Sequence, residues 1–443
     1  MSNSSCFAND SSQRHWEELS PPENARPYYL GKRSMPDRNE SDYGSQCPDS
    51  GSQSSRAGSD PILSRRRFVR AGAFTAGGLV LGLERVLGAV PSDPPPGARF
   101  AGLVPFEDEQ VAPAGTLMGN ELDARLFTDL SKVSSGRLVT PTAEFFIRSA
   151  ASRLLPVATG WKIGIDGLVG HATAVGIDAL RKNARPTGIH LMECAGNVAL
   201  TRFGLIGVAD WSGVPVADLL GEAKRKPGAA WVEISGFDEY SEPSRTSTPG
   251  ASWIFSLDAL KGAFLATEMN GQPLTRDHGA PVRLIIPGWY GAACIKWVNR
   301  ITFVEEGVEA SSQMQEYAVR TLQSGRPQFA RDYAPATVDP VALPVRVEKW
   351  IGGGKVQYRI VGIAWGGSQP IAGLRIRFNP EEQFAPVPRF RPAKADPWSV
   401  WTYTWSPPAP GGYRIRMAMA DPAVRARKLD LGLYDRTVHI SEL

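Results

Sequence analysis

The sequence predicts an α+β domain followed by a second domain that is a β-sandwich of immunoglobulin type. Three observations lead to this prediction. The chain has 443 residues, long for one domain, and its 45 glycines and 36 prolines favour loops and strands over long helices. Between about residues 100 and 305, short apolar runs mix with helical stretches. Beyond residue 340, strand-like runs recur with turn signals between them.

The composition excludes several classes of protein. The formal net charge at pH 7 is only +4, so the sequence does not indicate a nucleic-acid-binding protein, which usually concentrates basic residues on one face. Four cysteines are too few for a disulfide-rich scaffold, and five histidines disfavour a multi-histidine metal site. No apolar run reaches the roughly 18 residues that a membrane-spanning helix needs, so we expect no stable membrane span.

Residues 1–63 are expected to form a disordered extension. They are rich in serine and turn-forming residues, so they bury too little apolar surface to offset the entropy lost on ordering. Cys6 and Cys47 lie in this extension and are not expected to be structural. Met35 leaves a later translation start open.

Residues 64–90 resemble a twin-arginine export signal. The pair Arg65 and Arg66 is followed by a hydrophobic residue and then by the apolar stretch 71–83. This route carries folded proteins, often with a cofactor already inserted, so the resemblance implies a periplasmic protein. A buried amphipathic helix and a membrane anchor are the alternatives, although Glu84 ends the apolar run early.

The first folded domain is predicted over residues 98–320. It follows a proline-rich linker at 91–97 and contains a helical stretch at 216–220. Strand-like runs occur at 231–234 and 282–287. There is neither a βαβ rhythm nor a phosphate-binding glycine loop, so the pattern does not indicate a nucleotide-binding fold.

The second domain is predicted over residues 335–443, after a boundary rich in Gly, Pro and Asp at 324–340. The strands expected in it are Pro344–Ile351, Val356–Trp365, Ile371–Phe378, Val400–Trp405, Tyr413–Ala420 and Thr437–Ser441. This spacing is typical of an immunoglobulin-type sandwich. The paired cysteines of antibody domains are absent from the sequence, so the likeness is architectural only.

Removal of the signal would leave two cysteines, Cys194 and Cys294. They could form a disulfide in an oxidising compartment, or each could be a buried structural cysteine. Cys194 stands out because an apolar stretch ends at it and the small residues and Asn197 that follow permit a sharp turn. A thiolate at such a strand end can ligate a soft metal.

Two other roles for Cys194 find little support. His190 lies four residues before it, but one histidine and one cysteine do not make a zinc site. A cysteine hydrolase would need a positioned base, and nothing in the sequence links His171, His190 or His278 to Cys194.

Four separated motifs resemble the sulfite oxidase family of molybdopterin-dependent oxidoreductases. The Glu-Cys-Ala-Gly-Asn run at 193–197 looks like the family's molybdenum-ligand motif. The stretches 268–283, 287–291 and the Lys296-Trp297 pair resemble the family in the same order. The resemblance covers about residues 100–320 and implies a sulfite-oxidase-type molybdopterin-binding domain, with the β-sandwich as the family's dimerisation domain.

The resemblance also implies roles for individual residues. Cys194 would be the single protein ligand to molybdenum, and Arg148 and Tyr317 would be the active-site arginine and tyrosine. Charged and amide groups suit the phosphate and polar heterocycle of molybdopterin. The matches for its contact residues are Phe146, Ile147, Arg148, Ser149, Ala150, Asp238, His278, Arg283, Cys294, Ile295 and Lys296.

The sequence departs from the family's pattern where positive charge is expected. Val198 and Ala199 stand where sulfite oxidases commonly have arginine, and Ala150 replaces a histidine. A desolvated anion such as sulfite needs charge-assisted donors, so both changes weaken the case for sulfite as substrate. Arg202, or a cation from the C-terminal domain, could replace the missing charge.

The resemblance implies oxygen-atom transfer on a small sulfur-containing substrate, with molybdenum and molybdopterin as cofactor. The sequence contains no Cys-x-x-Cys-His haem motif, so electrons would pass to a separate cytochrome-type acceptor. A homodimer is expected from the predicted dimerisation domain. Two alternatives stay open: a periplasmic molybdenum reductase acting on sulfoxides, and a cofactor-free exported binding protein.

Overall fold

The computed structural model describes residues 96–107, 113–152, 154–238, 251–388, 390 and 397–443. All of them belong to one compact unit of the chain, Phe74–Leu443. The predicted extension 1–63 and export signal 64–90 lie outside the described residues. Within the described residues, no helix combines the length and apolar character needed to cross a membrane.

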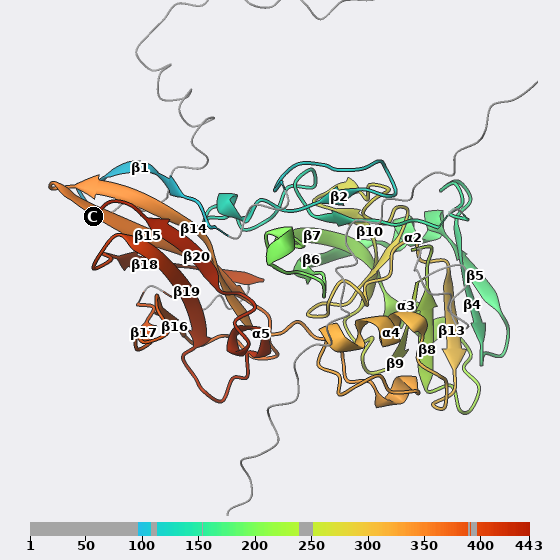
Figure 1. Ribbon diagram of the computed structural model, residues 1–443. Coiled ribbons are helices and arrows are strands. Elements are labelled where there is room, and N and C mark those ends of the chain that lie inside the picture. Colours follow the sequence, from blue (N-terminus) through green and yellow to red (C-terminus); the bar gives the residue numbers. More distant parts are fainter. Residues whose placement is uncertain (1–95, 108–112, 153, 239–250, 389, 391–396) are drawn as a thin grey trace, which may run out of the picture. The chain divides into compact units, whose positions relative to one another are not determined.

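Two five-stranded sheets form the first domain (Figure 1). The first sheet is antiparallel and contains β11 (Gln272–Pro273), β10 (Phe264–Met269), β7 (Ile206–Pro215) and β6 (Arg185–Glu193), with β12 (Arg283–Ile285) also paired to β10. The second has the order β5 (Thr173–Gly176), β4 (Lys162–Gly167), β13 (Arg300–Val304), β8 (Trp231–Ser235) and β9 (Ser252–Ser256). Its β4–β13 pair is parallel. A two-stranded ribbon, β2 (Arg125–Leu126) and β3 (Ile147–Arg148), accompanies them.

The helices of the described residues are few and short, so the domain is mostly β rather than the balanced α+β fold that the sequence predicts. They are α2 (Ile177–Asn183), α3 (Val216–Glu222), α4 (Ser312–Tyr317) and α5 (Arg427–Asp430), with 3₁₀ turns η1 (Leu130–Lys132), η2 (Ala199–Thr201), η3 (Ala318–Arg320) and η4 (Ala330–Asp332). The helix expected at 216–220 is confirmed as α3, whose Val216, Leu219 and Leu220 are buried. The strands expected at 231–234 and 282–287 are confirmed as β8 and β12.

Two four-stranded antiparallel sheets form the C-terminal part of the chain. One has the order β1 (Arg99–Val104), β14 (Val341–Gly352), β15 (Lys355–Trp365) and β18 (Trp398–Trp405). The other has the order β17 (Ala385–Pro386), β16 (Leu374–Arg377), β19 (Gly411–Met419) and β20 (Arg436–Ile440). All six strands predicted for this region are confirmed within a few residues. The immunoglobulin type of the sandwich stays a prediction.

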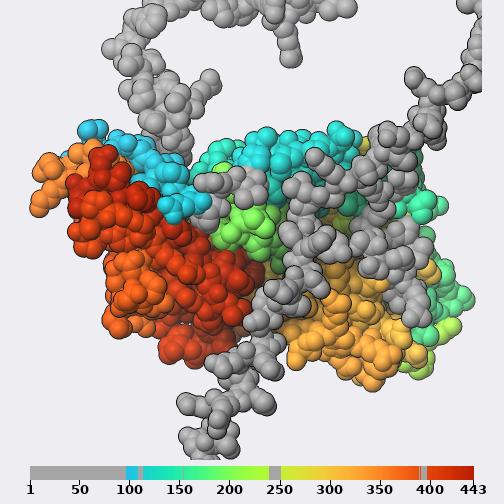
Figure 2. Space-filling view, viewed as in Figure 1, coloured from blue at the N-terminus to red at the C-terminus, as the bar shows by residue number. Residues whose placement is uncertain are grey.

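Strand β1 joins the C-terminal sheet rather than the first domain. Its Arg99 pairs with Ile351 and its Val104 with Val347, and Phe106 bridges to Val438. In Figure 2 the blue residues of this segment lie against the orange and red C-terminal residues. The sequence assigns residues 98–320 to the first domain, but the start of that range pairs with β14 in the C-terminal sheet. The paired residues are more than 240 positions apart, and no local pattern reveals such a contact.

Close packing between β15 and β18 depends on a glycine. At Gly362 in β15, an added Cβ would overlap the indole of Trp401, which is fully buried, and lie 2.6 Å from the carbonyl oxygen of Leu343. Protein interiors are close-packed, so this position has no room for a methyl group.

We expect Gly362→Ala to lower the free energy of unfolding by about 1–3 kcal/mol, the usual cost of overpacking a core. Gly412→Ala in β19 is the matched control, because nothing lies within 4 Å of the added Cβ there. Thermal or denaturant unfolding checks both variants. Equal stability of the two would contradict the packing argument.

Candidate active site

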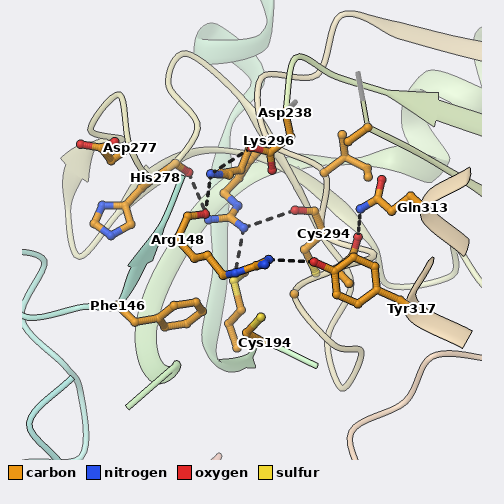
Figure 3. Close-up of a pocket in the computed structure, with 16 residues that line it drawn as sticks. Phe146, Arg148, Cys194, Asp238, Asp277, His278, Cys294, Lys296, Gln313 and Tyr317 are labelled. Carbon is orange, nitrogen blue, oxygen red and sulfur yellow. Dashed lines mark hydrogen bonds and ion pairs between the residues drawn. The ribbon is translucent and has the colours of Figure 1, made fainter. Parts of the chain in front are cut away.

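One cavity gathers residues from distant parts of the first domain (Figure 3). Ten of the residues that the sequence assigns to the site line it: Phe146, Arg148, Cys194, Asp238, His278, Arg283, Cys294, Ile295, Lys296 and Tyr317. The structure therefore brings together side chains that are up to 171 positions apart in the chain.

Cys194 lies directly after β6, at the wall of this cavity. Its backbone N–H donates to the carbonyl of Leu205 at 2.9 Å, and its own carbonyl accepts from Asn197 N–H at 3.0 Å, which closes a tight turn. Cys194 and Cys294 are both buried free thiols, so the disulfide alternative is wrong. The ring of His190 contacts the carbonyl of Thr187 at 2.9 Å and is not part of the cavity lining.

Arg148 and Tyr317 meet beside Cys194. Arg148 ends β3 and Tyr317 ends α4, and the guanidinium Nη1 donates to the tyrosine hydroxyl at 2.7 Å (Figure 3). Burial raises the pKa of Tyr317 to about 12, although the charge of Arg148 opposes the shift. The hydroxyl therefore stays protonated at neutral pH, and it can donate its hydrogen to a bound ligand while accepting from Arg148.

Arg283 is a buried cation in the wall of the cavity. Its Nη1 donates to the carbonyl of His278 at 3.1 Å, and its Nη2 donates to the carbonyl of Cys294 and to the sulfur of Met192, both at 3.3 Å. Burial lowers the pKa of Arg283, against the opposing effects of Cys294 and Asp238. An arginine stays charged at neutral pH in proteins, so this side chain contributes positive charge to the site.

Lys296 brings a second buried cation to the same wall. Its Nζ donates to Ser149 Oγ and to the carbonyl of Arg148, each at 3.0 Å, and lies 3.5 Å from the carboxylate of Asp238. Burial lowers the pKa of Lys296 to about 8, although Asp238 opposes the shift, so the amine is charged at pH 7. Gly236 permits this arrangement, because an added Cβ there would overlap the carbonyl of Lys296.

His278 is neutral and has a defined tautomer. Its Nε2 lies 3.3 Å from the carbonyl of Phe145, which can only accept, so Nε2 carries the hydrogen. Nδ1 then accepts from the hydroxyl of Thr275 at 2.7 Å. Burial lowers the pKa of His278 to about 4, helped by the charges of Arg283 and Lys296.

Three predicted contact residues do not line the cavity: Ile147, Ser149 and Ala150. Ile147 packs in a small separate cluster with Ala124 and Leu126. Ser149 instead supports the site from behind, because its hydroxyl accepts from Lys296 and donates to the carbonyl of Asp277 at 2.9 Å.

Sequence reasoning missed six residues of the lining: Met192, Ala251, Asp277, Gly291, Ala292 and Gln313. Asp277 and Gly291 lie inside segments that carry the family resemblance, so they could have been found there. Gln313 lies four residues before Tyr317 on α4, and this spacing places two side chains on one face of a helix. Ala251 and Ala292 carry no chemical signal.

The positions where sulfite oxidases commonly have arginine do not line this cavity, and neither do the residues that could replace the missing charge. Val198 is 41% exposed, and neither it nor Ala199 is part of the lining. Arg202 lines a different pocket, together with Arg346 and Arg436. All described lining residues come from positions 146–317, so among them no cation of the C-terminal part enters the site.

The residues present fit a molybdenum cofactor. A thiol suited to a soft metal lies in the same cavity as two buried cations suited to a phosphate. Two buried polar atoms of the lining residues have no hydrogen-bond partner within the described structure: Arg283 Nε, a donor, and Gln313 Oε1, an acceptor. The amide of Gln313 is oriented by its Nε2, which donates to the carbonyl of Ala292. A bound polar heterocycle would supply both kinds of partner.

Comparison with known proteins agrees with this donor set. Residues 153–312 match the family model described as the oxidoreductase molybdopterin binding domain. The chain is 29% identical to mitochondrial sulfite oxidase of Homo sapiens over 315 residues, which cover 62% of this chain and 54% of that protein.

The chain belongs to the sulfite oxidase family of molybdopterin-dependent oxidoreductases. Its cofactor is accordingly molybdenum with molybdopterin.

Other relatives of this family show how widely the likeness extends. Nitrate reductase [NADPH] of Fusarium oxysporum is 29% identical over 269 residues, covering 52% of this chain and 29% of that protein. The crystal structure of the sulfane dehydrogenase SoxCD from Paracoccus pantotrophus has the same fold, with a TM-score of 0.53 and 19% identity over 81% of this chain and 86% of that one. The chain spans about half the length of the sulfite oxidases that it matches.

The low pKa of His278 predicts a pH-dependent stability. Because the folded pKa of about 4 lies below the ordinary value of 6.5, the unfolded chain binds the proton first as pH falls. The free energy of unfolding should therefore drop by up to about 3 kcal/mol between pH 6.5 and 4 on account of this group. Denaturant unfolding of the cofactor-free chain measures it, with His278→Gln as the variant that removes the titration. Equal pH slopes for both proteins would contradict the assignment.

Proposed function

We propose that the protein catalyses oxygen-atom transfer to a small sulfur compound, sulfite or a related one, and passes the electrons to a separate cytochrome. The observation that carries the proposal is the pair of Arg148 and Tyr317, joined at 2.7 Å in the cavity that also holds Cys194. The likeness to sulfite oxidases supports a sulfur substrate.

Each side chain has a separate task in this proposal. Cys194 would hold the metal through its thiolate, and Arg283 and Lys296 would bind the phosphate of the pterin. The bound cofactor supplies the two-electron oxygen-transfer chemistry, and the protein binds, orients and tunes it. Arg148 and the protonated hydroxyl of Tyr317 would hold the oxygen atoms of the substrate beside the metal.

The charge of the cavity favours a substrate less charged than sulfite. Arg148 is the cation that bonds Tyr317 beside Cys194, whereas Arg283 and Lys296 already donate to backbone carbonyls and to Ser149. Val198, Ala199 and Ala150 add no charge, and a desolvated dianion needs several charge-assisted donors.

A reductase that removes oxygen from sulfoxides is the second candidate, because the same residues serve the reverse reaction. The nitrate reductases among the relatives support a reductive role. Assays with sulfite and an artificial one-electron acceptor, and with a sulfoxide and a reduced dye, separate the two directions. The similarity to cofactor-dependent enzymes argues against a cofactor-free binding protein.

The cellular setting is part of the proposal. The twin-arginine signal at 64–90 would export the loaded protein to the periplasm, where a cytochrome accepts its electrons. The C-terminal sheets would form an immunoglobulin-like dimerisation domain, which makes the enzyme a homodimer.

We expect the enzyme to turn over sulfite weakly, with a KM far above the micromolar range. Each charge-assisted hydrogen bond contributes about 1.5–3 kcal/mol, so two missing contacts weaken a small dianion by about two orders of magnitude or more. Steady-state kinetics with sulfite and an artificial acceptor measure this KM. A low micromolar value would contradict the substrate argument and favour plain sulfite oxidation.

Arg148→Gln should raise the sulfite KM by a further factor of about 10–100, because it removes the cation beside the substrate. Arg300→Gln is the matched control, since Arg300 forms an exposed ion pair with Asp166 on the neighbouring strand β4 and does not line the cavity. Equal KM values for the two variants would show that Arg148 does not contact the substrate.

A further inference from the structure

The carboxylate of Glu193, the residue immediately before Cys194, is completely buried and is held by residues of the C-terminal part of the chain. Its Oε1 accepts from Lys428 Nζ at 3.1 Å and from the hydroxyl of Tyr434 at 2.8 Å. Its Oε2 accepts from the indole Nε1 of Trp365 at 2.8 Å. A buried carboxylate that accepts from three such donors has a strongly fixed position.

A second set of contacts connects this carboxylate with the turn that carries Cys194. Asn197 Nδ2 donates to Glu193 Oε1 at 3.3 Å, and Asn197 Oδ1 accepts from the backbone N–H of Leu205 at 3.0 Å. Leu205 in turn accepts from the backbone N–H of Cys194 at 2.9 Å. The hydroxyl of Tyr434 also lies 3.3 Å from the carbonyl of Asn197. Asn197 and Tyr434, which both bond the Glu193 carboxylate, therefore also bond the end of the turn that begins at Cys194.

Lys428 also contacts Tyr290, the residue before Gly291, and Gly291 lines the cavity. Lys428 Nζ lies 4.7 Å from the centre of the Tyr290 ring, and the hydroxyl of Tyr290 donates to the buried Asp339 at 3.1 Å. Gly291, which follows Tyr290 and lines the cavity, donates its N–H to the carbonyl of Glu193 at 2.7 Å. The buried pair of Glu193 and Lys428 is thus linked to two segments of the lining, at Cys194 and at Gly291.

We propose that Glu193 is a positioning residue for the molybdenum ligand, and that Lys428, Trp365 and Tyr434 hold it so that the C-terminal part of the chain fixes the place of the Cys194 sulfur. The inference rests on Cys194 as the metal ligand. Groups behind a ligand orient it and tune the metal, and losing such a group typically costs about 10–100-fold in metal affinity or activity.

Two measurements on Glu193→Gln, Lys428→Met and the double variant test this proposal. The first is hydrogen exchange of the Leu205 amide in the full chain without cofactor, which reports the turn directly. The second is the Mo(V) electron paramagnetic resonance spectrum of the loaded enzyme, which reports the geometry at the thiolate. Each single variant leaves a buried charge without its partner. We therefore expect the Leu205 amide to exchange at least about tenfold faster than in the unmodified protein, and the Mo(V) spectrum to shift. The double variant, whose site is again neutral, should lie closer to the unmodified protein than either single variant.

Glu348→Gln is the control for stability alone. Glu348 is also a fully buried carboxylate, paired with Arg346 and Arg359 at 2.7 Å, but it belongs to the C-terminal sheet and does not line the cavity. The Glu348→Gln substitution should lower the melting temperature without changing the Leu205 exchange rate or the Mo(V) spectrum. Trp365→Phe removes one neutral donor, so it provides a milder test if the charge variants do not fold.

The outcomes separate this inference from the proposed function. If Glu193→Gln and Lys428→Met match Glu348→Gln in both the exchange rate and the spectrum, the positioning role is wrong and the enzyme assignment stands. The same conclusion follows if the charge variants do not fold and Trp365→Phe changes neither signal. If the unmodified protein purified from a molybdopterin-producing host contains no molybdenum, the proposed function fails, while the exchange data still test the link between Glu193 and the turn.

Discussion

The turn from Cys194 to Asn197 is the constraint on which the site depends. It ends β6, returns the chain to Leu205 at the start of β7, and presents one thiol to the cavity. Because β6 and β7 are paired along nearly their whole length, the sheet holds both ends of this turn. A soft metal needs a sulfur ligand at a fixed place, and a turn at the end of a paired strand provides it.

Charge is distributed unevenly around that thiol. Arg283, Lys296 and the neutral His278 form one part of the lining, where a phosphate and a polar heterocycle fit, whereas Arg148 and Tyr317 form another part beside the thiol. Outside the cavity wall, Glu193 and Lys428 compensate each other in the protein interior. This distribution of charge is the basis for proposing a substrate less charged than a dianion.

Much of this arrangement is readable from the sequence, because its signals are local. Strand-like runs with turn signals between them predict the C-terminal strands, and the resemblance to the sulfite oxidase family predicts ten of the lining residues. Contacts between distant positions give no such signal. The pairing of β1 with β14 and the bond from Lys428 to Glu193, 235 positions apart, follow from tertiary packing alone. The α+β class expected from the sequence is too rich in helix, since the described helices of the first domain are few and short beside its two sheets.

The central claim is that the thiolate of Cys194 binds molybdenum in this cavity. X-ray absorption at the molybdenum edge, compared between the unmodified protein and Cys194→Ser, tests it most directly. Serine keeps the size of the side chain and replaces the soft sulfur by a hard oxygen. The account predicts that both proteins retain pterin and that the variant has one sulfur fewer and one oxygen more bound to the metal. An unchanged number of sulfur ligands, or full activity of the variant, would contradict it.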